Sequence, residues 1–384
     1  MKIKVLQVVG NLRIGGAETV AMNIYRYIDR DKYEFHYLVY GNEIGDYEKE
    51  VEQLGGKVIH ISYSPHVINK TYYSDLKNIV KQYGPYEIIH AHMMLHNALI
   101  LKFAEKLKIP IRISHAHSTT DGAEKKNLIQ AIVREVYSLI AKYRIRKYAT
   151  TFISCGDRAG IYLYGKKFYM RNGILIKNGI EIEKYLYNPN IRDNLRRQNN
   201  LNNKLVLACI GHFERVKNHE FLIRIFKKIH DVNPKAILYL LGDGPLKPEI
   251  EKQVREAELQ DCVLMTGNVT NVSDWMQAID YLLMPSLYEG VPLTLIEAQV
   301  AGLKCFVSDK VSKEVNITGN IKFLPLDKLS GWLDIAFLDN EYNRKIDLKM
   351  IQENGYDVKT NIHLIEKLYN RQEEKIIGKN KKNE

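Results

Sequence analysis

The stretch YLLMPSLYEGVPLTLIEAQVAG (281–302) decides the fold, because it holds a strand, a tight loop and a helix in direct succession. The apolar run 281–286 has the length and composition of a buried strand. Gly290 and Pro292 end that strand, and Pro292 suits the first position of a helix, where its missing N–H costs nothing. Apolar residues then recur at near-helical spacing until Gly302 stops the run. The free N–H groups at such a helix start form a ready site for a phosphate or diphosphate.

Two glutamates flank this predicted helix start. Glu289 lies on the loop and Glu297 lies one turn into the helix. A carboxylate accepts hydrogen bonds from the vicinal hydroxyl groups of a ribose or a sugar. A diphosphate between two hydroxyl-rich rings is the shape of a nucleotide-sugar, so the segment predicts a nucleotide-sugar site.

The same alternation of strands and helices runs along the whole chain, whose 384 residues predict about two domains. The strand-like runs are 3–9, 34–40, 57–61, 87–91, 111–115, 150–154 and 174–178, then 205–211, 236–242, 262–267, 281–286, 304–308 and 321–325. Helical patterns separate them, which favours an α/β fold with parallel sheets covered on both faces. The alternation breaks in a polar, Asn-rich stretch, where we place a linker (181–204) between domains at 1–180 and 205–355.

Composition indicates a soluble globular protein of a reducing compartment. No apolar run approaches the ~18 residues of a membrane span. The N-terminal apolar run is interrupted by Gln7 and ended by Gly10, so it predicts a first strand and not a signal peptide. The four cysteines, Cys155, Cys209, Cys262 and Cys305, lack metal-ligand or redox spacing. Three of the four lie in or beside apolar strand-like runs, where buried, reduced thiols are expected. We therefore expect a cytoplasmic protein.

The loop and helix read EGVPLTLIEA (289–298), which resembles the E-x7-E signature of the family-4 retaining glycosyltransferases in its usual context, E-G-x-P-x-x-x-x-E-A. These enzymes have the GT-B fold, so the resemblance implies two doubly wound Rossmann-like domains facing across a cleft. It also implies that the last helix, at 356–374, returns to the first domain. The tail at 375–384 is polar and charged, and we expect it to be disordered.

The resemblance extends to GHFERVKNHEF (211–221), which follows a strand and opens a helix. Lys217 in this loop can neutralise a diphosphate leaving group, the main electrostatic task in breaking a sugar–phosphate bond. The family usually has an arginine where this chain has His212. Either His212 as a cation or Arg215 is therefore expected to bind the same phosphate.

Two further segments resemble the family's donor site. The backbone of Gly267, Asn268 and Val269 matches the region that contacts the nucleotide base, and its groups would suit a uracil edge. Gly15 and Gly16 lie in the first strand-to-helix loop, which in the family meets the donor diphosphate or the acceptor. The donor contacts expected around the central helix start are Gly290, Val291, Pro292, Leu293 and Thr294.

Histidines cluster in HAHMMLH (90–96) and ISHAHSTT (113–120), and both segments follow predicted strands. A metal site is the tempting interpretation, but the His-x-His pairs lie in loops without a clear third ligand, so we predict no metal and no cofactor. The resemblance instead suggests that His117, or alternatively His115, hydrogen-bonds the transferred sugar. A structural hydrogen bond is the plainer expectation for His90 and His96.

An Asp-x-Asp pair, as metal-dependent glycosyltransferases of the other major fold use, occurs at Asp29 and Asp31. It ends the first helix, and a helix-end turn explains it better than a metal site.

The positive charge is concentrated in the first half of the chain. The net charge of +11 arises from 27 Lys and Arg against 16 Asp and Glu in residues 1–180, whereas residues 181–384 have 29 of each. The richest part is 125–148, where apolar residues recur at helical spacing among seven cations. We expect a helix whose apolar side faces the core and whose basic face is solvated. That face could also bind an anionic membrane or a phosphate-bearing acceptor.

Together these features imply a retaining glycosyltransferase that transfers a sugar from a nucleotide-sugar, expected to be a UDP-sugar, to a glycan or lipid-linked acceptor in the assembly of capsule or other surface polysaccharide. In this scheme Glu297 holds the ribose hydroxyls, Glu289 contacts the donor sugar and Lys217 holds the departing diphosphate, whose oxygen takes the acceptor proton. The enzyme would lie in the cytoplasm or peripherally on the inner face of the membrane.

Two other functions remain open from sequence. A nucleotide-sugar epimerase of GT-B-like fold would need an acid/base pair at a ring carbon, which the E-x7-E context does not favour. A non-enzymatic basic module could use the positive first half. The chain lacks a recognised nucleic-acid motif and interleaved aromatic residues for base stacking, so we expect no nucleic-acid partner.

Overall fold

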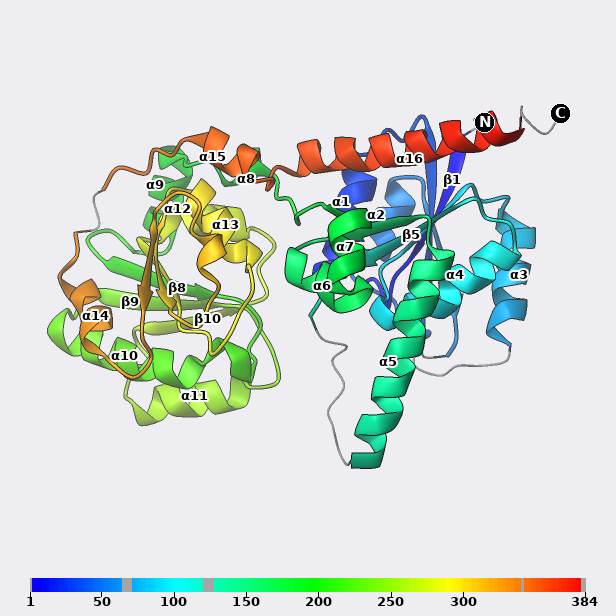
Figure 1. Cartoon of the computed structure of the whole chain (residues 1–384). Helices are drawn as coiled ribbons and strands as arrows, with labels where there is room; N and C mark the ends of the chain where they lie inside the picture. The colour runs from blue at the N-terminus through cyan, green and yellow to red at the C-terminus, as the bar shows by residue number, and fades with distance from the viewer. Residues whose placement is uncertain (1, 64–70, 120–127, 340–341, 381–384) are drawn as a thin grey trace. The chain divides into compact units, whose positions relative to one another are not determined.

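The computed structural model describes residues 2–63, 71–119, 128–339 and 342–380 (Figure 1). The chain forms two compact units. Unit 1 contains residues 1–179 and 358–384, and unit 2 contains residues 180–357. Each unit is a parallel sheet covered by helices, so the predicted Rossmann-like α/β architecture is confirmed.

Unit 1 contains a seven-stranded parallel sheet in the order β3-β2-β1-β4-β5-β6-β7. Its strands are β1 (Ile3–Val8), β2 (Tyr33–Tyr40), β3 (Lys57–Ile61), β4 (Ile88–Ala91), β5 (Ile111–Ala116), β6 (Thr151–Ser154) and β7 (Gly173–Leu175). Its helices are α1 (Gly16–Tyr27), α2 (Glu48–Gln53), α3 (Tyr72–Tyr83), η1 (Met94–His96), α4 (Asn97–Lys106), α5 (Leu128–Tyr148), α6 (Asp157–Tyr164), α7 (Lys166–Asn172) and α16 (Val358–Asn380). The strand order reverses between β1 and β4, where doubly wound sheets bind their ligands.

Unit 2 contains a six-stranded parallel sheet in the order β10-β9-β8-β11-β12-β13. Its strands are β8 (Leu205–Ile210), β9 (Ala236–Leu241), β10 (Val263–Gly267), β11 (Tyr281–Met284), β12 (Lys304–Ser308) and β13 (Ile321–Leu324). Its helices are α8 (Ile182–Tyr185), α9 (Pro189–Gln198), η2 (Arg215–Lys217), α10 (His219–Val232), α11 (Lys247–Glu256), α12 (Val272–Ala278), α13 (Leu293–Val300), η3 (Lys313–Val315), α14 (Ser330–Leu333), η4 (Asp334–Phe337) and α15 (Leu348–Glu353). Here the order reverses between β8 and β11.

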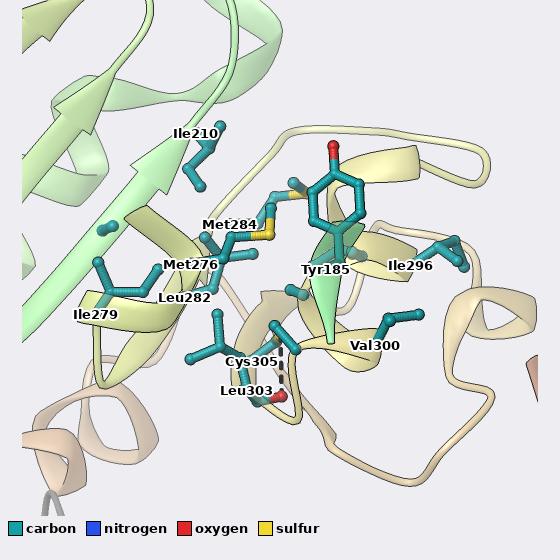
Figure 2. Close-up of a cluster of buried hydrophobic side chains, with 14 of the residues drawn as sticks. Tyr185, Ile210, Met276, Ile279, Leu282, Met284, Ile296, Val300, Leu303 and Cys305 are labelled. Atoms are coloured by element: carbon teal, nitrogen blue, oxygen red, sulfur yellow. Dashed lines mark hydrogen bonds between the residues drawn. The ribbon is translucent and has the colours of Figure 1, made fainter. Parts of the chain in front are cut away.

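The central strands are apolar because helices cover both faces of each sheet. All six residues of β8 are buried, and β11 is buried throughout. One core cluster of unit 2 packs α12 and α13 against the sheet, with Met276, Leu282, Met284 and Ile296 among its members (Figure 2). This packing fixes α13, the helix on which the predicted site depends.

The predicted linker at 181–204 is wrong, because this stretch folds as part of unit 2. It contains α8 and α9, and α9 begins at Pro189 after an Asn188 side chain that accepts hydrogen bonds from two backbone amides of the first turn. The buried side of α9 carries Arg196, which lies 3.2 Å from the buried carboxylate of Asp280. A helix anchored by a buried ion pair lacks an apolar stripe, so its pattern resembles a loop.

Helix α16 belongs to unit 1, where the predicted returning helix was expected. Its residues Val358, Ile362, Ile365 and Tyr369 join the core cluster that contains α1. The helix continues through residue 380, so the first part of the predicted disordered tail is helical. Residues 381–384 of that tail lie outside the described residues.

Helix α5 differs from the prediction in the direction of its apolar side. Six large apolar residues are exposed: Ile132, Val133, Val136, Leu139, Ile140 and Tyr143. At 3.6 residues per turn they cover about a third of the helix circumference. The opposite side, with Ser138, Ala141 and Ile145, is the one buried against unit 1. The expectation that this apolar side faces the core is therefore wrong, because the side with Ser138, Ala141 and Ile145 packs there instead.

The four cysteines are free thiols, with Cys155 half-buried and the other three buried, as expected. Among the helices of the described part of the chain, none combines the length and apolar character needed to cross a bilayer.

Candidate functional site

The predicted succession of strand, loop and helix is present from β11 to α13, but Pro292, which was expected to be the first helical residue, lies one position before it. Pro292 occupies the N-cap position with extended backbone, and the helix starts at Leu293. Within the described residues the amides of Leu293 and Thr294 have no backbone acceptor, as expected in a first helical turn. Gly290, Val291, Leu293 and Thr294 are at least partly exposed. The helix start therefore offers N–H groups to an anion.

The loop after β8 packs against the neighbouring loop after β9. The amide of Phe213 donates to the carbonyl of Asp243 at 2.9 Å. Gly242 has a φ of +149°, and a Cβ there would lie 2.1 Å from the carbonyl oxygen of Gly211. Only glycine allows this approach, which holds the loops at the carboxyl edge of the sheet together.

Lys217 and Glu289 meet at this edge. The Lys217 Nζ lies 2.6 Å from the Glu289 Oε1, which also accepts a hydrogen bond from the Ser286 hydroxyl at 3.1 Å. The side chains of Lys217 and Glu289 are only 15% and 18% exposed. The amide of Ser312 fixes the Glu289 carbonyl at 3.1 Å. A lysine ammonium has three N–H donors, so Lys217 keeps capacity for a phosphate oxygen while it holds Glu289 in place.

Glu297 lies in the second turn of α13 and is half-buried. Its Oε1 accepts a hydrogen bond from the Tyr185 hydroxyl at 2.9 Å. The Tyr185 ring lies against the apolar cluster while its hydroxyl points out of it (Figure 2). Burial raises the pKa of Glu297, and the bond from Tyr185 opposes that rise. Tyr185 thus orients a carboxylate that has acceptor capacity left for a ligand hydroxyl.

The remaining donor residues of unit 2 lie at the same sheet edge. His212 is exposed and lies 3.6 Å from Glu214, and Arg215 is exposed in η2. The Gly267 carbonyl accepts from Gly242 at 3.0 Å, while Asn268 is exposed and Val269 half-buried beyond the end of β10. Both His212 and Arg215 are thus accessible, and their geometry does not choose between them.

In unit 1, Gly15 and Gly16 start α1 as the N-cap and the first helical residue. A Cβ on Gly15 would lie 2.6 Å from the Glu18 Oε2, so a larger residue here would displace that flexible carboxylate. Burial raises the pKa of Glu18. The predicted glycine loop is therefore the N-terminus of α1, with a half-buried carboxylate against it.

Four histidines form one cluster: His90 on β4, His115 on β5, and His92 and His117 in the loops that follow these strands. The expectation that both His-x-His pairs lie in loops is therefore wrong for His90 and His115, because each strand extends through its first histidine. Burial lowers the pKa of His90 and His117 to about 3, and holds those of His92 and His115 well below the usual value. All four imidazoles are therefore neutral near pH 7. His115 is 1% exposed, whereas His117 is half-buried. His96 lies apart from the cluster, in η1.

Ring nitrogens of His90, His92 and His115 lie within 4.8 Å of one another, so these residues could in principle hold a metal ion. Hydrogen bonds account for the arrangement more fully. His90 Nε2 lies 3.2 Å from His115 Nδ1, and His92 Nε2 lies 2.8 Å from the amide oxygen of Gln7. A metal ligand would have to give up these bonds.

Gln7 and Tyr369 form hydrogen bonds to this histidine cluster, and the sequence did not reveal either as a functional candidate. The signal for Gln7 was present, because it is the polar residue that interrupts the first apolar strand, and it is fully buried. Tyr369 carried no such signal, because its role depends on the packing of α16 against β1 and β4.

Comparison with known proteins gives a consistent family. Residues 14–184 match the family described as Glycosyltransferase Family 4, and residues 191–324 match the one described as Glycosyl transferases group 1. EpsF of Bacillus subtilis, a protein named as a glycosyltransferase, is 31% identical over 381 residues that cover 97% of each chain. The capsular polysaccharide biosynthesis glycosyltransferase CapH of Staphylococcus aureus is 25% identical over 77% of this chain and 78% of its own.

Solved structures share the fold. HepE of Anabaena, in complex with UDP and glucose, superposes with a TM-score of 0.74 at 18% identity and covers 96% of this chain and 100% of its own. WaaG, a glycosyltransferase involved in lipopolysaccharide biosynthesis, gives a TM-score of 0.60 at 14% identity over 94% of this chain and 95% of its own. The GT-B expectation for the fold is therefore confirmed.

Proposed function

Since this chain belongs to the family-4, group-1 glycosyltransferases, we propose that it transfers a sugar from a UDP-sugar to a glycan or lipid-linked acceptor, with retention of anomeric configuration. The observation that carries the proposal is the edge of unit 2, where Lys217, Glu289 and the free amides of α13 gather. That edge supplies a cation, a carboxylate and a helix start to a single ligand.

The relatives support the choice of substrates. HepE was solved with UDP-glucose. A relative in Escherichia coli, 24% identical over 77% of this chain, is named as a UDP-Gal:alpha-D-GlcNAc-diphosphoundecaprenol alpha-1,3-galactosyltransferase. CapH acts in capsular polysaccharide biosynthesis. We infer from them a role in surface polysaccharide assembly. None of the relatives supports an epimerase.

The proposed roles follow from the geometry of unit 2. Lys217 and the first amides of α13 stabilise the departing diphosphate. Glu297, held by Tyr185, accepts hydrogen bonds from the ribose hydroxyls. Glu289 contacts the donor sugar, and its bond to Lys217 couples sugar position to leaving-group charge. These cations and amides can hold a diphosphate, so we propose a reaction that needs no metal.

The other predicted donor contacts keep supporting roles. The backbone beside Gly267, Asn268 and Val269 would meet the base, because it extends past the end of β10 at the same edge. His212 or Arg215 would add a second cation at a phosphate. In unit 1, Gly15 and Gly16 present the amides of α1, which suit the donor diphosphate or an acceptor phosphate.

A screen of nucleotide-sugars tests the proposal. The purified protein is incubated with UDP-, GDP- and CMP-sugars and a mixture of diphosphate-linked lipid acceptors, with and without EDTA. We expect UDP release from one or a few UDP-sugars, unaffected by EDTA, and a product whose anomeric configuration matches that of the donor. Turnover of GDP-sugars alone would contradict the UDP-sugar donor. Loss of activity in EDTA would contradict the metal-free reaction, and an inverted product would contradict retention.

We also propose that α5 attaches the enzyme to an anionic membrane surface. The observation that favours this is its exposed apolar stripe, defined above by Ile132, Val133, Val136, Leu139, Ile140 and Tyr143. The exposed Lys147 and the half-buried Arg144 add positive charge beside the stripe, as in helices that lie in a membrane interface. Anionic lipid would attract the basic residues while the apolar stripe enters the acyl boundary.

Vesicle sedimentation tests the membrane proposal. The wild-type protein is expected to sediment with phosphatidylglycerol vesicles and much less with phosphatidylcholine vesicles. Val136→Glu, which places a carboxylate in the stripe, should release most of the bound protein. Val232→Glu is the matched control, because Val136 and Val232 are 51% and 54% exposed and only the first lies on α5. Equal binding of both variants would contradict the proposal.

A further inference from the structure

Two rows of hydrogen-bonded side chains cross the histidine cluster of unit 1. The first row starts at Tyr369 on α16, whose hydroxyl lies 2.9 Å from His90 Nδ1. His90 Nε2 then lies 3.2 Å from His115 Nδ1, with an angle of 10° between the rings. Their centroids are 5.3 Å apart, close to the nitrogen separation plus the two ring radii. The two rings thus lie end to end, as an imidazole N–H···N hydrogen bond requires.

The second row starts at Gln7 on β1. Its amide oxygen lies 2.8 Å from His92 Nε2, and His92 Nδ1 lies 2.8 Å from His117 Nε2. The rings of His92 and His117 are 5.0 Å apart with an angle of 22°, so they too lie end to end.

The two rows are stacked and share one origin. The β4 histidines of the two rows have centroids 4.3 Å apart, and the β5 histidines have centroids 4.1 Å apart. The amide nitrogen of Gln7 donates to the Tyr369 hydroxyl at 3.4 Å. The Gln7 side chain therefore contacts the start of both rows. Its amide oxygen contacts His92 in the second row, and its amide nitrogen contacts Tyr369 in the first.

The second row fixes the proton positions of its members. The Gln7 oxygen can only accept, so His92 carries its proton on Nε2. Because His92 is neutral, its Nδ1 is an acceptor and must receive the bond from His117 Nε2–H. The remaining nitrogen of His117, Nδ1, is then a bare lone pair.

The first row follows the same logic. The Tyr369 oxygen accepts from Gln7, so its hydroxyl proton is directed to His90 Nδ1. His90 then carries its proton on Nε2 and donates to His115 Nδ1. His115 in turn carries its proton on Nε2, where it ends the row as an N–H group.

We propose that Gln7 and Tyr369 are positioning residues that hold all four histidines in the Nε2–H form, so that His117 ends its row as an acceptor and His115 as a donor. In the part of the chain described, His117 Nδ1 and His115 Nε2 are shielded from solvent and lack a hydrogen-bond partner. If His117 meets the transferred sugar, which rests on the proposed function, the acceptor end selects a hydroxyl group of that sugar.

The burial of the cluster supports fixed proton positions. His90, His92 and His115 are at most 4% exposed, and protonation of any ring would place a charge among neutral imidazoles. His115 Nε2 belongs to a ring that also lines a cavity of about 20 Å³ between α1 and α16. His117 is the less buried of the two end rings, but its Nδ1 is itself shielded from solvent, so the sugar contact requires a small opening beside this ring.

Rotation of the Gln7 amide by half a turn would reverse every bond in both rows. All four rings would then carry their protons on Nδ1, and the two free ends would exchange character. The four tautomers are therefore tied to one side chain, and mixed sets are inconsistent with the geometry. This makes the arrangement measurable without any substrate.

Long-range proton–nitrogen correlation spectra of the full chain, labelled with ¹⁵N-histidine, test the proposal. We expect four buried imidazoles, each with a protonated Nε2 and an unprotonated Nδ1. Four Nδ1–H rings, mixed tautomers or rapid exchange between tautomers would overturn the proposal. Stoichiometric zinc that survives dialysis against EDTA and removes these N–H signals would also overturn it, since the cluster would then be a metal centre.

Two variants separate the rows. Gln7→Glu offers an acceptor to both rows, so His92 and His117 should keep Nε2–H while His90 and His115 switch to Nδ1–H. Tyr369→Phe removes only the hydroxyl that begins the first row. His90 and His115 should then no longer be held in one tautomer, whereas His92 and His117 should be unchanged. Tyr369→Phe keeps the ring and therefore serves if Gln7→Glu does not fold. Identical spectra for wild type and Tyr369→Phe would contradict the proposal that Tyr369 sets the tautomers of the first row.

A kinetic experiment addresses the link to the sugar. Gln7→Leu should raise the donor KM about tenfold with less than a threefold change in kcat, because the acceptor end of the second row loses its fixed tautomer. Leu6→Met, a volume-conserving change on the opposite face of the same strand, is the control and should leave KM unchanged. An unchanged KM in Gln7→Leu would refute the sugar contact. If the predicted tautomers are observed but the protein transfers no sugar, the proposed function is refuted, and the control of the tautomers by Gln7 and Tyr369 still holds.

Discussion

In unit 2 the loops after β8 and β11 bring a lysine and a glutamate within 2.6 Å of each other. In unit 1 the carboxyl ends of β4 and β5, with the residues that follow them, bring together four neutral imidazoles. Both sheet edges bury polar groups, and they satisfy them in different ways. Lys217 and Glu289 satisfy each other across 2.6 Å, whereas burial lowers the pKa of the histidines and leaves them neutral.

The difference suggests a division of work. A departing diphosphate gains charge, so the ion pair and helix start of unit 2 are suited to it. A sugar hydroxyl is neutral and directional, so an imidazole of fixed tautomer is suited to it. Each of the following experiments perturbs the polar groups of one unit and leaves those of the other unchanged.

The largest effect is expected from Lys217→Ala, which removes the leaving-group cation. We expect kcat to fall by ~100- to 1,000-fold, the range seen when one preorganised electrostatic group is lost. Lys227→Ala, which breaks an exposed pair with Asp231 on α10, is the control. Initial rates at saturating donor measure both. If kcat falls by less than fivefold in Lys217→Ala, Lys217 does not stabilise the leaving group.

The two glutamates should differ in kind. Glu297→Ala should weaken UDP binding by ~10- to 100-fold, because a carboxylate hydrogen-bonded to the ribose is worth about 1.5–3 kcal/mol. Glu289→Ala should lower kcat more than it weakens binding. Calorimetric titration with UDP and initial-rate kinetics separate the two quantities.

Tyr185→Phe is the graded control for this pair, because it removes only the hydroxyl that orients Glu297. Its loss of UDP affinity should be smaller than that of Glu297→Ala. If Glu289→Ala weakens UDP binding and Glu297→Ala mainly lowers turnover, their roles are exchanged.

The last expected effect concerns the pH dependence of stability, not turnover or binding, and belongs to unit 1. The pKa of His90 and His117 is about 3 in the folded protein, against about 6.5 in an unfolded chain. The unfolded state therefore binds more protons below pH 6.5, so stability should be lost as pH falls from 6.5 toward 3. Each histidine contributes up to about 1.4 kcal/mol per pH unit. Hydrogen exchange in β4 and β5 at pH 7 and pH 5 measures the loss, and greater protection at pH 5 would contradict it.

Much of this arrangement could be predicted from sequence. The strands and helices appear where the apolar periods place them, and Glu289, Glu297 and Lys217 lie at one edge because their motifs follow neighbouring strands of a parallel sheet. A short-range signal suffices for these residues, since Lys217 and Glu289 lie in the loops directly after β8 and β11 and Glu297 lies in the helix that follows the second loop.

Other features depend on tertiary contacts that no local pattern records. Helix α9 resembles a linker, because an ion pair to Asp280 anchors it in place of an apolar stripe. In α5 the helical periodicity is present, but the buried face is the one with Ser138, Ala141 and Ile145 and not the one with the apolar stripe. Tyr369 meets Gln7 across 362 positions of sequence, so the hydrogen-bond rows emerge only after folding.

The central claim is that unit 2 binds the nucleotide half of a sugar donor, and hydrogen exchange with and without UDP tests it most directly. We predict that UDP slows exchange in residues 211–217, 267–269 and 289–297 of the full chain, and that Glu297→Ala needs a higher UDP concentration for the same protection. Protection by UDP only in other segments, or no protection by any nucleoside diphosphate, would contradict the account.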